Sequence, residues 1–248
     1  MEQTRALAGP ELTPRTAVVW TVLRAELDRH GGRPLTVLDI GGGTGGFAVP
    51  LAAAGHRVTV VDASPDALAA LTRRAAEAAV GDRIRAVQGD GDALAGLVEP
   101  GSVDLVLCHA VLEVVDDPAT VLAAIATALR PGAAASVLVA GRAAAVLTRA
   151  MNGHLSTAAS LAAAPEGSTG ARDTLRRRYD ADTAATLLTA AGLTVEEIHG
   201  VRVLADLVPA VVADGDPGAL LELELALASR IPYRDLAAQL HLFARRPA

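Results

Sequence analysis

The fold of this chain is decided by residues 37–47, which read VLDIGGGTGGF. A short apolar run leads into five glycines and one threonine, and residues 48–54 then begin a helix-forming stretch. The order of strand, tight turn and helix predicts a nucleotide-like ligand here, because a glycine backbone can approach a ligand where any Cβ would collide. Residues 41–46 also satisfy the dinucleotide pattern G-x-G-x-x-G, so the glycines alone leave the ligand open.

Short valine-rich runs alternate with helix-forming stretches around this turn. We expect buried parallel strands at residues 35–40, 57–61, 84–87, 103–107 and 135–139. We expect helices at residues 15–30, 65–80 and 118–129, each closed by glycine or proline. Further along, the patterns predict a helix at 180–191, a strand at 193–204, a helix at 217–229 and a final edge strand at 236–244. The whole predicts an α/β fold with a doubly wound, mostly parallel seven-stranded sheet and an antiparallel edge strand.

The same patterns divide the chain into four regions. Residues 1–34 form an N-terminal segment and a helix that covers the ligand site, and residues 35–142 form the ligand-binding core. Residues 143–192 contain several glycines and a proline but little strand pattern before residue 180, which predicts a helical cap with a mobile loop. Residues 193–248 complete the sheet.

The composition is typical of a globular protein with one sizeable core, since 51% of the 248 residues are hydrophobic and 20% are charged. The single cysteine, Cys108, excludes an internal disulfide and a cysteine-rich zinc site, and we expect no metal. No apolar run reaches the roughly 20 residues of a membrane span, and residues 1–9 lack a signal-peptide pattern, so we expect a cytoplasmic location. The net charge of -6 argues against strong non-specific binding to nucleic acid.

Acidic residues follow the first two predicted strands. In open α/β sheets the ligand lies beyond the carboxyl ends of the strands. Gly41 and Gly43 let the backbone approach it, and Asp39 is placed to orient the turn. Asp62 follows Gly41 by 21 residues, near the spacing of about 20 for a carboxylate that binds ribose hydroxyls. The alternative role for Asp62 is a helix N-cap, which Ser64 could fill as well.

The later motifs resemble those of the class I S-adenosylmethionine-dependent methyltransferases. The third strand leads to Asp90, whose carboxylate suits an adenine amino group, and the fourth ends at His109. Together with residues 39–46 and Asp62, these positions match the family's motifs in order. Further segments resemble the bacterial tRNA 5-carboxymethoxyuridine methyltransferases, namely residues 108–113, 117–118, 129–132, 200–203, 219–224, 232–233 and 244–247. The resemblance implies the Rossmann-like methyltransferase fold and S-adenosyl-L-methionine as cofactor.

The resemblance also implies roles for individual residues. It implies Arg15 on the methionine carboxylate, Gly41 and Gly42 around the methionine and ribose, Asp62 on the ribose, Asp90 near the adenine and His109 beside the sulfonium. Asp39, Gly43, Ala63 and Gly91 complete the predicted cofactor set. The alternatives are an exposed arginine at the start of a helix for Arg15 and a satisfied histidine at the end of a strand for His109.

A carboxylate acceptor would need no general base, because a carboxyl group with a pKa of about 4 is already ionised near pH 7. The protein has only to hold the acceptor oxygen in line with the methyl group and exclude water. Arg142 and Arg202, each near a predicted strand end, are candidates for holding it, with Tyr179 as a contact from the cap. The alternative for the arginines is surface charge.

The methyl acceptor is either tRNA or a small molecule. Residues 142–178 carry six arginines against two acidic residues, and the cluster 172–178 could bind a tRNA backbone or form a solvated face. Compared with the tRNA enzymes, residues 1–14 are short and contain no aromatic residue. The competing functions are a small-molecule O- or N-methyltransferase and a non-catalytic protein that binds S-adenosylmethionine.

Overall fold

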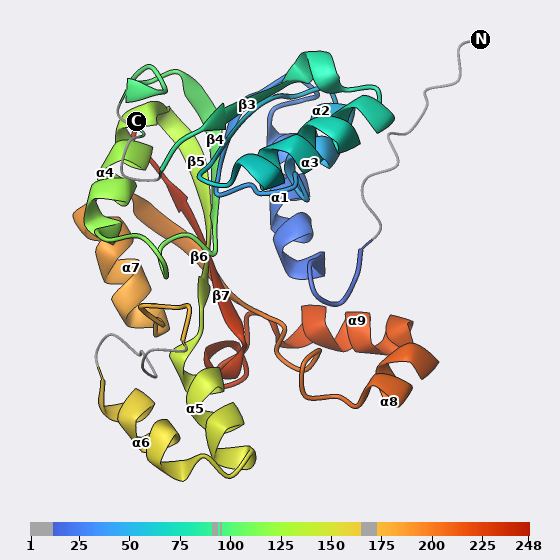
Figure 1. Ribbon diagram of the computed structural model, residues 1–248, viewed down its shortest axis with the longest axis vertical. Helices are drawn as coiled ribbons and strands as arrows, with labels where there is room; N and C mark the ends of the chain where they lie inside the picture. The colour runs from blue at the N-terminus through green and yellow to red at the C-terminus, as the bar shows by residue number, and fades with distance from the viewer. Residues whose placement is uncertain (1–11, 91–93, 95, 165–172) are drawn as a thin grey trace.

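The computed structural model describes residues 12–90, 94, 96–164 and 173–248. One seven-stranded sheet in the order β3-β2-β1-β4-β5-β7-β6 runs through the molecule (Figure 1). The strands β1 to β5 are parallel, and β7 runs antiparallel to both of its neighbours. The predicted α/β class and mostly parallel seven-stranded sheet are therefore confirmed. The strands are β1 (Thr36–Ile40), β2 (Arg57–Asp62), β3 (Ile84–Gln88), β4 (Val103–His109), β5 (Leu129–Ala140), β6 (Thr194–Val201) and β7 (Gln239–Arg245).

The helices begin and end close to the predicted positions, because local caps fix them. Ser64 accepts a hydrogen bond from the amide of Ala67, and Pro65 takes the first helical position of α3. Asp117 and Asp216 cap two further helices in the same way. The helices are α1 (Ala17–Arg29), α2 (Ala48–Ala53), α3 (Pro65–Glu77), α4 (Pro118–Ala128), α5 (Arg142–Met151), α6 (Leu155–Ala163), α7 (Ala181–Ala190), α8 (Ala210–Gly215) and α9 (Pro217–Leu227).

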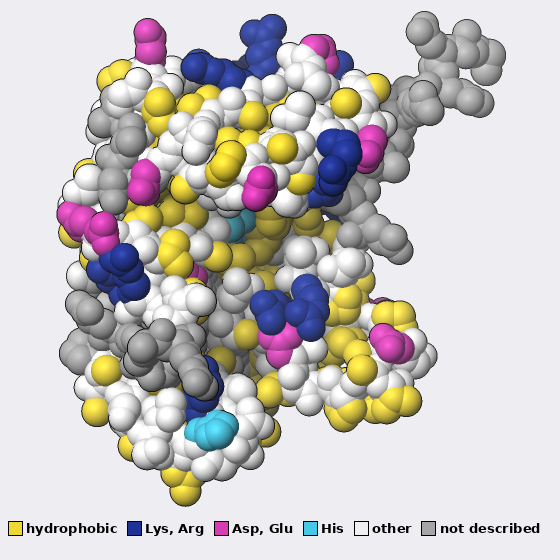
Figure 2. All heavy atoms as spheres, in the orientation of Figure 1, with side chains coloured by type: hydrophobic (Ala, Val, Ile, Leu, Met, Phe, Trp, Pro, Cys, Tyr) yellow, Lys and Arg dark blue, Asp and Glu magenta, His cyan; other side chains and the backbone are white. Residues whose placement is uncertain are grey.

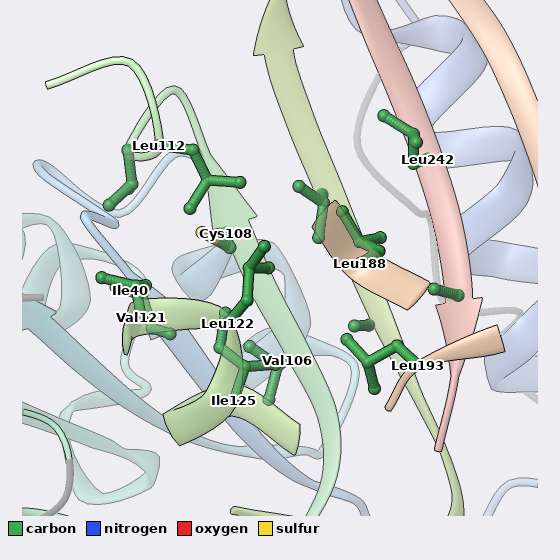
Figure 3. Packing of buried hydrophobic residues seen from close by; sticks show 14 of the residues in the cluster. Ile40, Val106, Cys108, Leu112, Val121, Leu122, Ile125, Leu188, Leu193 and Leu242 are labelled. Carbon is green, nitrogen blue, oxygen red and sulfur yellow. The ribbon is translucent and has the colours of Figure 1, made fainter. Parts of the chain in front are cut away.

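Two hydrophobic layers cover the sheet, one on each face. α1, α2 and α3 lie on one side of the sheet, and α4 and α7 lie on the other (Figure 1). Buried side chains of each set pack on the face that the helices cover. Figure 3 shows the second layer, where Val106 and Cys108 of β4 face Leu122 and Ile125 of α4. Burial raises the pKa of the Cys108 thiol far above its ordinary value, so this cysteine serves as a packing residue.

The last strand is not at the edge of the sheet, so the expectation for residues 236–244 was wrong in this respect. β7 lies between β5 and β6. Both of its faces are buried, with Leu240 and Leu242 toward one layer and Phe243 toward the other. β6 forms the edge instead, and its exposed Glu196 and Glu197 fit that position, because charged side chains protect edge strands from pairing with other chains.

The predicted cap, residues 143–192, divides into two parts. α5 and α6 form a helical pair beyond the end of β5 (Figure 1), while α7 packs against α4 and the sheet. The predicted mobile loop falls largely on residues 165–172, which lie outside the described residues. α8, which the sequence patterns did not predict, precedes α9. Within the described ranges, no helix is both long and apolar enough to cross a membrane.

Candidate functional site

The glycine turn after β1 packs directly on the strand beneath it. The amide of Gly41 donates a hydrogen bond to the carbonyl oxygen of Val61, which ties the turn to β2. Gly41 has a φ of 65°, and a Cβ on it would lie 2.5 Å from Val111. A Cβ on Gly42 would lie 2.5 Å from Oδ2 of Asp39. Only glycine fits these two positions, so the turn presents bare backbone at the carboxyl end of the sheet.

Asp39 is buried beneath this turn, with 3% of its surface exposed. Its Oδ2 atom has no hydrogen-bond partner among the described residues. Burial, together with the negative charge of Asp62, raises the pKa of Asp39 to about 7. Asp39 therefore supports the glycine turn by contact, and its unpaired carboxyl oxygen is a feature that usually marks a functional site.

Asp62 joins the glycine turn to the loop that follows β2. One carboxylate oxygen accepts the amide of Gly43 at 2.8 Å, and the other accepts the amide of Ser64 at 2.8 Å. Ser64, and not Asp62, caps α3, so the helix-cap alternative is excluded. Asp62 is half-buried, and the neighbouring Ala63 is exposed. The carboxylate is thus held at the carboxyl ends of β1 and β2, as the spacing predicted.

The third acidic position lies beside the second. The amide of Gly89 donates to the carbonyl oxygen of Asp62 at 3.1 Å, which brings the end of β3 next to the end of β2. Asp90 follows directly and is exposed. Gly91, also predicted to bind cofactor, lies outside the described residues. The structure therefore brings the carboxylates of Asp62 and Asp90 to adjacent strand ends.

His109 ends β4 and is one member of a row of polar side chains across the sheet. Its Nε2 atom lies 2.9 Å from Oγ of Ser136 on β5, and the same oxygen lies 2.8 Å from Nε2 of His241 on β7. Burial lowers the pKa of His109 to about 4 and that of His241 well below its ordinary value, so both imidazoles are neutral near pH 7.

Aromatic rings connect this row to the glycine turn. The ring of Phe47, at the end of the turn, meets the His109 ring edge-on with 4.7 Å between centroids. Trp20 of α1 stacks on the other side of Phe47 at 4.9 Å. The contact places α1 against the glycine turn. That this helix covers the ligand site stays a prediction.

Two predicted site residues, Arg15 and Arg202, meet at a single carboxylate that sequence reasoning missed. Nη2 of Arg15 lies 3.1 Å from Oδ1 of Asp206, and Nη2 of Arg202 contacts Oδ2 of the same side chain. Figure 2 shows basic and acidic side chains together on the rim of a hollow between the α1–α3 lobe and the α8–α9 lobe. The structure thus brings residues 15 and 202 together from opposite ends of the chain.

Arg142 and Tyr179 are engaged within the protein. The guanidinium of Arg142 pairs with Asp180 and donates to the carbonyl oxygen of Ala164 at 3.1 Å. Tyr179 is 3% exposed, and its hydroxyl donates to the carbonyl oxygen of Leu112 at 2.9 Å. The role of Tyr179 as a contact from the cap stays a prediction, and the structure places its ring in the hydrophobic core.

Two arginines of the cluster 172–178, Arg176 and Arg177, contact the loop that follows β4. Arg176 pairs with Asp116, and Arg177 donates to the carbonyl oxygens of Val115 and Asp116 at 2.5 and 2.7 Å. Arg178 is buried and makes a bidentate pair with Asp173. Arg172 lies outside the described residues. Arg176 and Arg177 are therefore structural partners of this loop in addition to any role as surface charge, whereas Arg178 pairs within its own segment.

The same loop holds a buried carboxyl that the sequence did not single out. Oε1 of Glu113 accepts the amide of Ala140 at 2.6 Å, and Oε2 has no partner within the part of the chain that the structure describes. Burial raises the pKa of Glu113 to about 7. No group of three or more His, Cys, Asp or Glu side chains in the described ranges could hold a metal ion.

Comparison with known families and proteins points in one direction. Residues 38–137 match the family described as "Methyltransferase domain". The tRNA 5-carboxymethoxyuridine methyltransferase of Escherichia coli K12 is 32% identical over 236 residues, which cover 94% of this chain and 88% of that enzyme. The ubiquinone biosynthesis O-methyltransferase of Ralstonia nicotianae is 40% identical over 96 residues, which cover 39% of each chain.

Solved structures share the fold. An S-adenosylmethionine-dependent methyltransferase from Mesorhizobium loti superposes with a TM-score of 0.62 at 20% identity, covering 94% of this chain and 100% of that one. Magnesium protoporphyrin IX methyltransferase from Synechocystis PCC 6803, with bound SAH, gives a TM-score of 0.61 at 17% identity, covering 98% and 92%. Because the similarity to the Escherichia coli enzyme covers nearly the whole of this chain, the chain belongs to the S-adenosylmethionine-dependent methyltransferases.

Proposed function

We propose that this enzyme methylates a carboxylate of a modified wobble uridine, 5-carboxymethoxyuridine, in tRNA. The observation that carries the proposal is the similarity to the Escherichia coli enzyme of that name, which extends over 94% of this chain and 88% of the relative. Similarity over that length includes the segments outside the cofactor-binding core. Because the core binds the cofactor, these outer segments are the ones left to contact the acceptor.

The cofactor's nucleoside end lies at the carboxyl ends of β1, β2 and β3. The Asp62 carboxylate, fixed by two amide hydrogen bonds, accepts the ribose hydroxyls, and Asp90 lies near the adenine. We expect Gly41 and Gly42 around the ribose and the methionine, with Gly43 and Ala63 beside them. Gly91, which completes the predicted set, lies outside the described residues. Asp39 supports the turn from below. The close packing of Gly42 on Asp39 leaves bare backbone facing the ligand, as a nucleoside site needs.

The cofactor's methionine end lies near His109 and the start of α1. S-adenosylmethionine would supply an electrophilic methyl group on a positively charged sulfur. A neutral His109 suits this position, because a protonated imidazole would repel the sulfonium. Arg15 precedes α1, and its guanidinium can pair with the methionine carboxylate through two parallel hydrogen bonds.

The acceptor carboxylate needs no base, so positioning and exclusion of water are the protein's contribution. Arg202, at the carboxyl end of β6 and on the same rim as Arg15, holds the acceptor oxygen. Arg142 and Tyr179 contribute indirectly. Arg142 ties the start of α5 to Asp180, and Tyr179 ties the same region to the loop after β4.

Cofactor binding is tested through Asp62. Replacing Asp62 with Ala removes the acceptor for the ribose hydroxyls, so S-adenosylmethionine should bind about ten- to a hundredfold more weakly in titration calorimetry. Glu77→Ala, at the exposed end of α3, is the matched control and should bind as the wild type does. Equal affinity in the Asp62 variant and the wild type would reject this site.

The acceptor is tested by incubating the enzyme with labelled cofactor and total tRNA, followed by nucleoside mass spectrometry. The expected product is the methyl ester of 5-carboxymethoxyuridine. Labelled tRNA without this ester would reject the proposed position. Tight cofactor binding without transfer to tRNA or to a metabolite extract would favour a non-catalytic cofactor-binding protein.

A small-molecule acceptor is the second candidate, and one observation favours it. Arg176, Arg177 and Arg178 are engaged with the protein's own residues, which reduces the charge available to attract a tRNA backbone. Labelling of a metabolite extract in place of tRNA would support an O- or N-methyltransferase for small molecules.

A further inference from the structure

Asp206 is shared by two arginines that come from distant parts of the chain. Arg15 precedes α1, whereas Arg202 and Asp206 follow β6. One oxygen of Asp206 lies 3.1 Å from Nη2 of Arg15, and the other contacts Nη2 of Arg202. Two positive charges thus share one negative charge.

The two ion pairs differ in how firmly they are held. The side chain of Arg15 is 60% exposed, while those of Arg202 and Asp206 are 29% and 28% exposed. An ion pair with one largely exposed partner contributes little to stability, because water screens its charges and the long side chain loses freedom when it is held. The Arg15 pair can therefore open at small cost, and Asp206 would keep Arg202 as a partner.

The backbone that carries Arg202 and Asp206 is fixed. Glu224 of α9 is completely buried, and its two oxygens accept the amides of Val203, Leu204 and Ala205 at 2.7–2.9 Å. Three hydrogen bonds to one carboxylate hold the turn in place. Any change at this site is therefore confined to side chains, and the exposed side chain of Arg15 is the one with room to move.

The side chain of Arg15 also has open space beside it. It lines a cavity of about 480 Å³ together with Asp206 and residues of α8 and α9. On α1, Trp20 stacks on Phe47 at the end of the glycine turn, so the start of this helix lies beside the proposed methionine end of the cofactor.

We propose that Asp206 is an internal competitor that occupies Arg15 until the carboxylate of the cofactor displaces it. In the ligand-free protein Arg15 pairs with Asp206; in the complex Arg15 pairs with the methionine carboxylate, and Asp206 stays paired with Arg202. No charge is left without a partner in either state. The exchange lowers the affinity for ligands that carry a carboxylate and leaves the affinity for other ligands unchanged, because only a ligand carboxylate has to displace Asp206 from Arg15. The inference rests on the proposed cofactor site.

The test compares two ligands that differ in the amino acid part. S-adenosylhomocysteine has the carboxylate, and 5′-methylthioadenosine lacks it. Asp206→Asn removes the competitor, so calorimetry should show S-adenosylhomocysteine binding about two- to fivefold more tightly, the factor expected for a partly exposed ion pair. Binding of 5′-methylthioadenosine should not change.

Three variants serve as controls. Asp214→Asn removes the same charge from an exposed position lining the same cavity and should leave both affinities unchanged. Asp206→Glu keeps a competing carboxylate and should bind both ligands as the wild type does. Asp206→Ser also removes the carboxylate and should reproduce the tighter binding of S-adenosylhomocysteine alone. It takes the place of Asp206→Asn if thermal unfolding shows that Asp206→Asn does not fold.

Weaker or unchanged binding of S-adenosylhomocysteine in both carboxylate-free variants would overturn the inference, and so would an equal change for both ligands. These results would leave the proposed cofactor site intact. A wild-type protein that binds neither ligand would reject the cofactor site itself.

Discussion

At the scale of single residues, Gly42 offers a sharp test of how closely the glycine turn packs. A Cβ there would lie 2.5 Å from the Asp39 carboxylate and 2.9 Å from Val60. Because both neighbours are buried, Gly42→Ala should lower the free energy of unfolding by about 1–3 kcal/mol. Gly46→Ala is the control in the same turn, since its Cβ would meet nothing within 4 Å. Denaturant unfolding of both variants measures the difference, and equal stabilities would contradict the packing.

Asp39 gives the ligand-free protein a distinct pH dependence. Burial and Asp62 raise its pKa from an ordinary value of 3.8 to about 7. Between these values the folded protein retains a proton that the unfolded chain releases, so this group lowers stability as the pH rises. Asp39→Asn cannot titrate. The free energy of unfolding of Asp39→Asn minus that of the wild type should therefore increase from pH 4 to pH 7 by an amount on the order of 3 kcal/mol, and then level off.

The measurement is the free energy of unfolding of both proteins at a series of pH values. Other titrating groups, such as Glu113, remain in both proteins and cancel in the comparison. A difference that stays constant from pH 4 to pH 8 would show that the pKa of Asp39 is not raised.

At the scale of secondary-structure elements, Glu224 of α9 orders the turn after β6. Its buried carboxylate accepts three backbone amides. Glu224→Gln turns one acceptor oxygen into a donor that faces these amides, and it should destabilise the protein by about 2–4 kcal/mol. Glu222→Gln, on the exposed face of the same helix, should change the free energy of unfolding by less than about 0.5 kcal/mol. Similar losses for both variants would argue against this capping role.

The sequence predicted those features that depend on local pattern. β1 to β4, the proline-started helices and the position of Asp62 follow from apolar runs, caps and spacing within a few tens of residues. Contacts that depend on which strands pair, and in which register, could not be predicted from local sequence pattern. Ser136 meets both His109 and His241 only because β5 pairs with β4 on one side and with β7 on the other.

Tyr179 illustrates the same limit for a single side chain. Sequence position suggested a contact from the cap, and the structure adds that the ring is buried and that its hydroxyl donates to a carbonyl oxygen 67 residues earlier in the chain. A tyrosine is buried when its hydroxyl finds a partner, and that partner is visible only in three dimensions.

At the scale of the whole molecule, Arg245 joins the two ends of the chain. On β7 it pairs with Glu26 of α1 at 2.9 Å and with Glu196 of β6 at 2.8 Å. These carboxylates raise the pKa of Arg245 above its ordinary value, and the pairing lowers the pKa of Glu26. Among the described residues, Arg245→Met would leave the buried Glu26 paired with Arg29 and His30 alone. We expect a loss of about 2–4 kcal/mol at pH 7.

The loss should shrink as the pH falls below the ordinary glutamate pKa of 4.5, because protonation of Glu26 removes the charge that Arg245 neutralises. Arg230→Met, at an exposed position, is the control and should be nearly neutral. Thermal unfolding at pH 7 and pH 4 tests both statements, and a loss that does not depend on pH would assign the effect to packing of the arginine stem instead.

The position of β7 between β5 and β6 has a consequence for biosynthesis. The ribosome makes β5 and β6 long before residues 239–245 exist, so the nascent chain carries two strands whose shared partner has not been translated. Until then, the backbone groups of β6 and one side of β5 face water, and the apolar surface that β7 will cover is open to other chains. Strand pairing of this kind, between residues far apart in sequence, is slow and exposed to aggregation. Completion of the fold therefore waits for the last strand to be synthesised, and a chaperone that shields β5 and β6 would act during that interval.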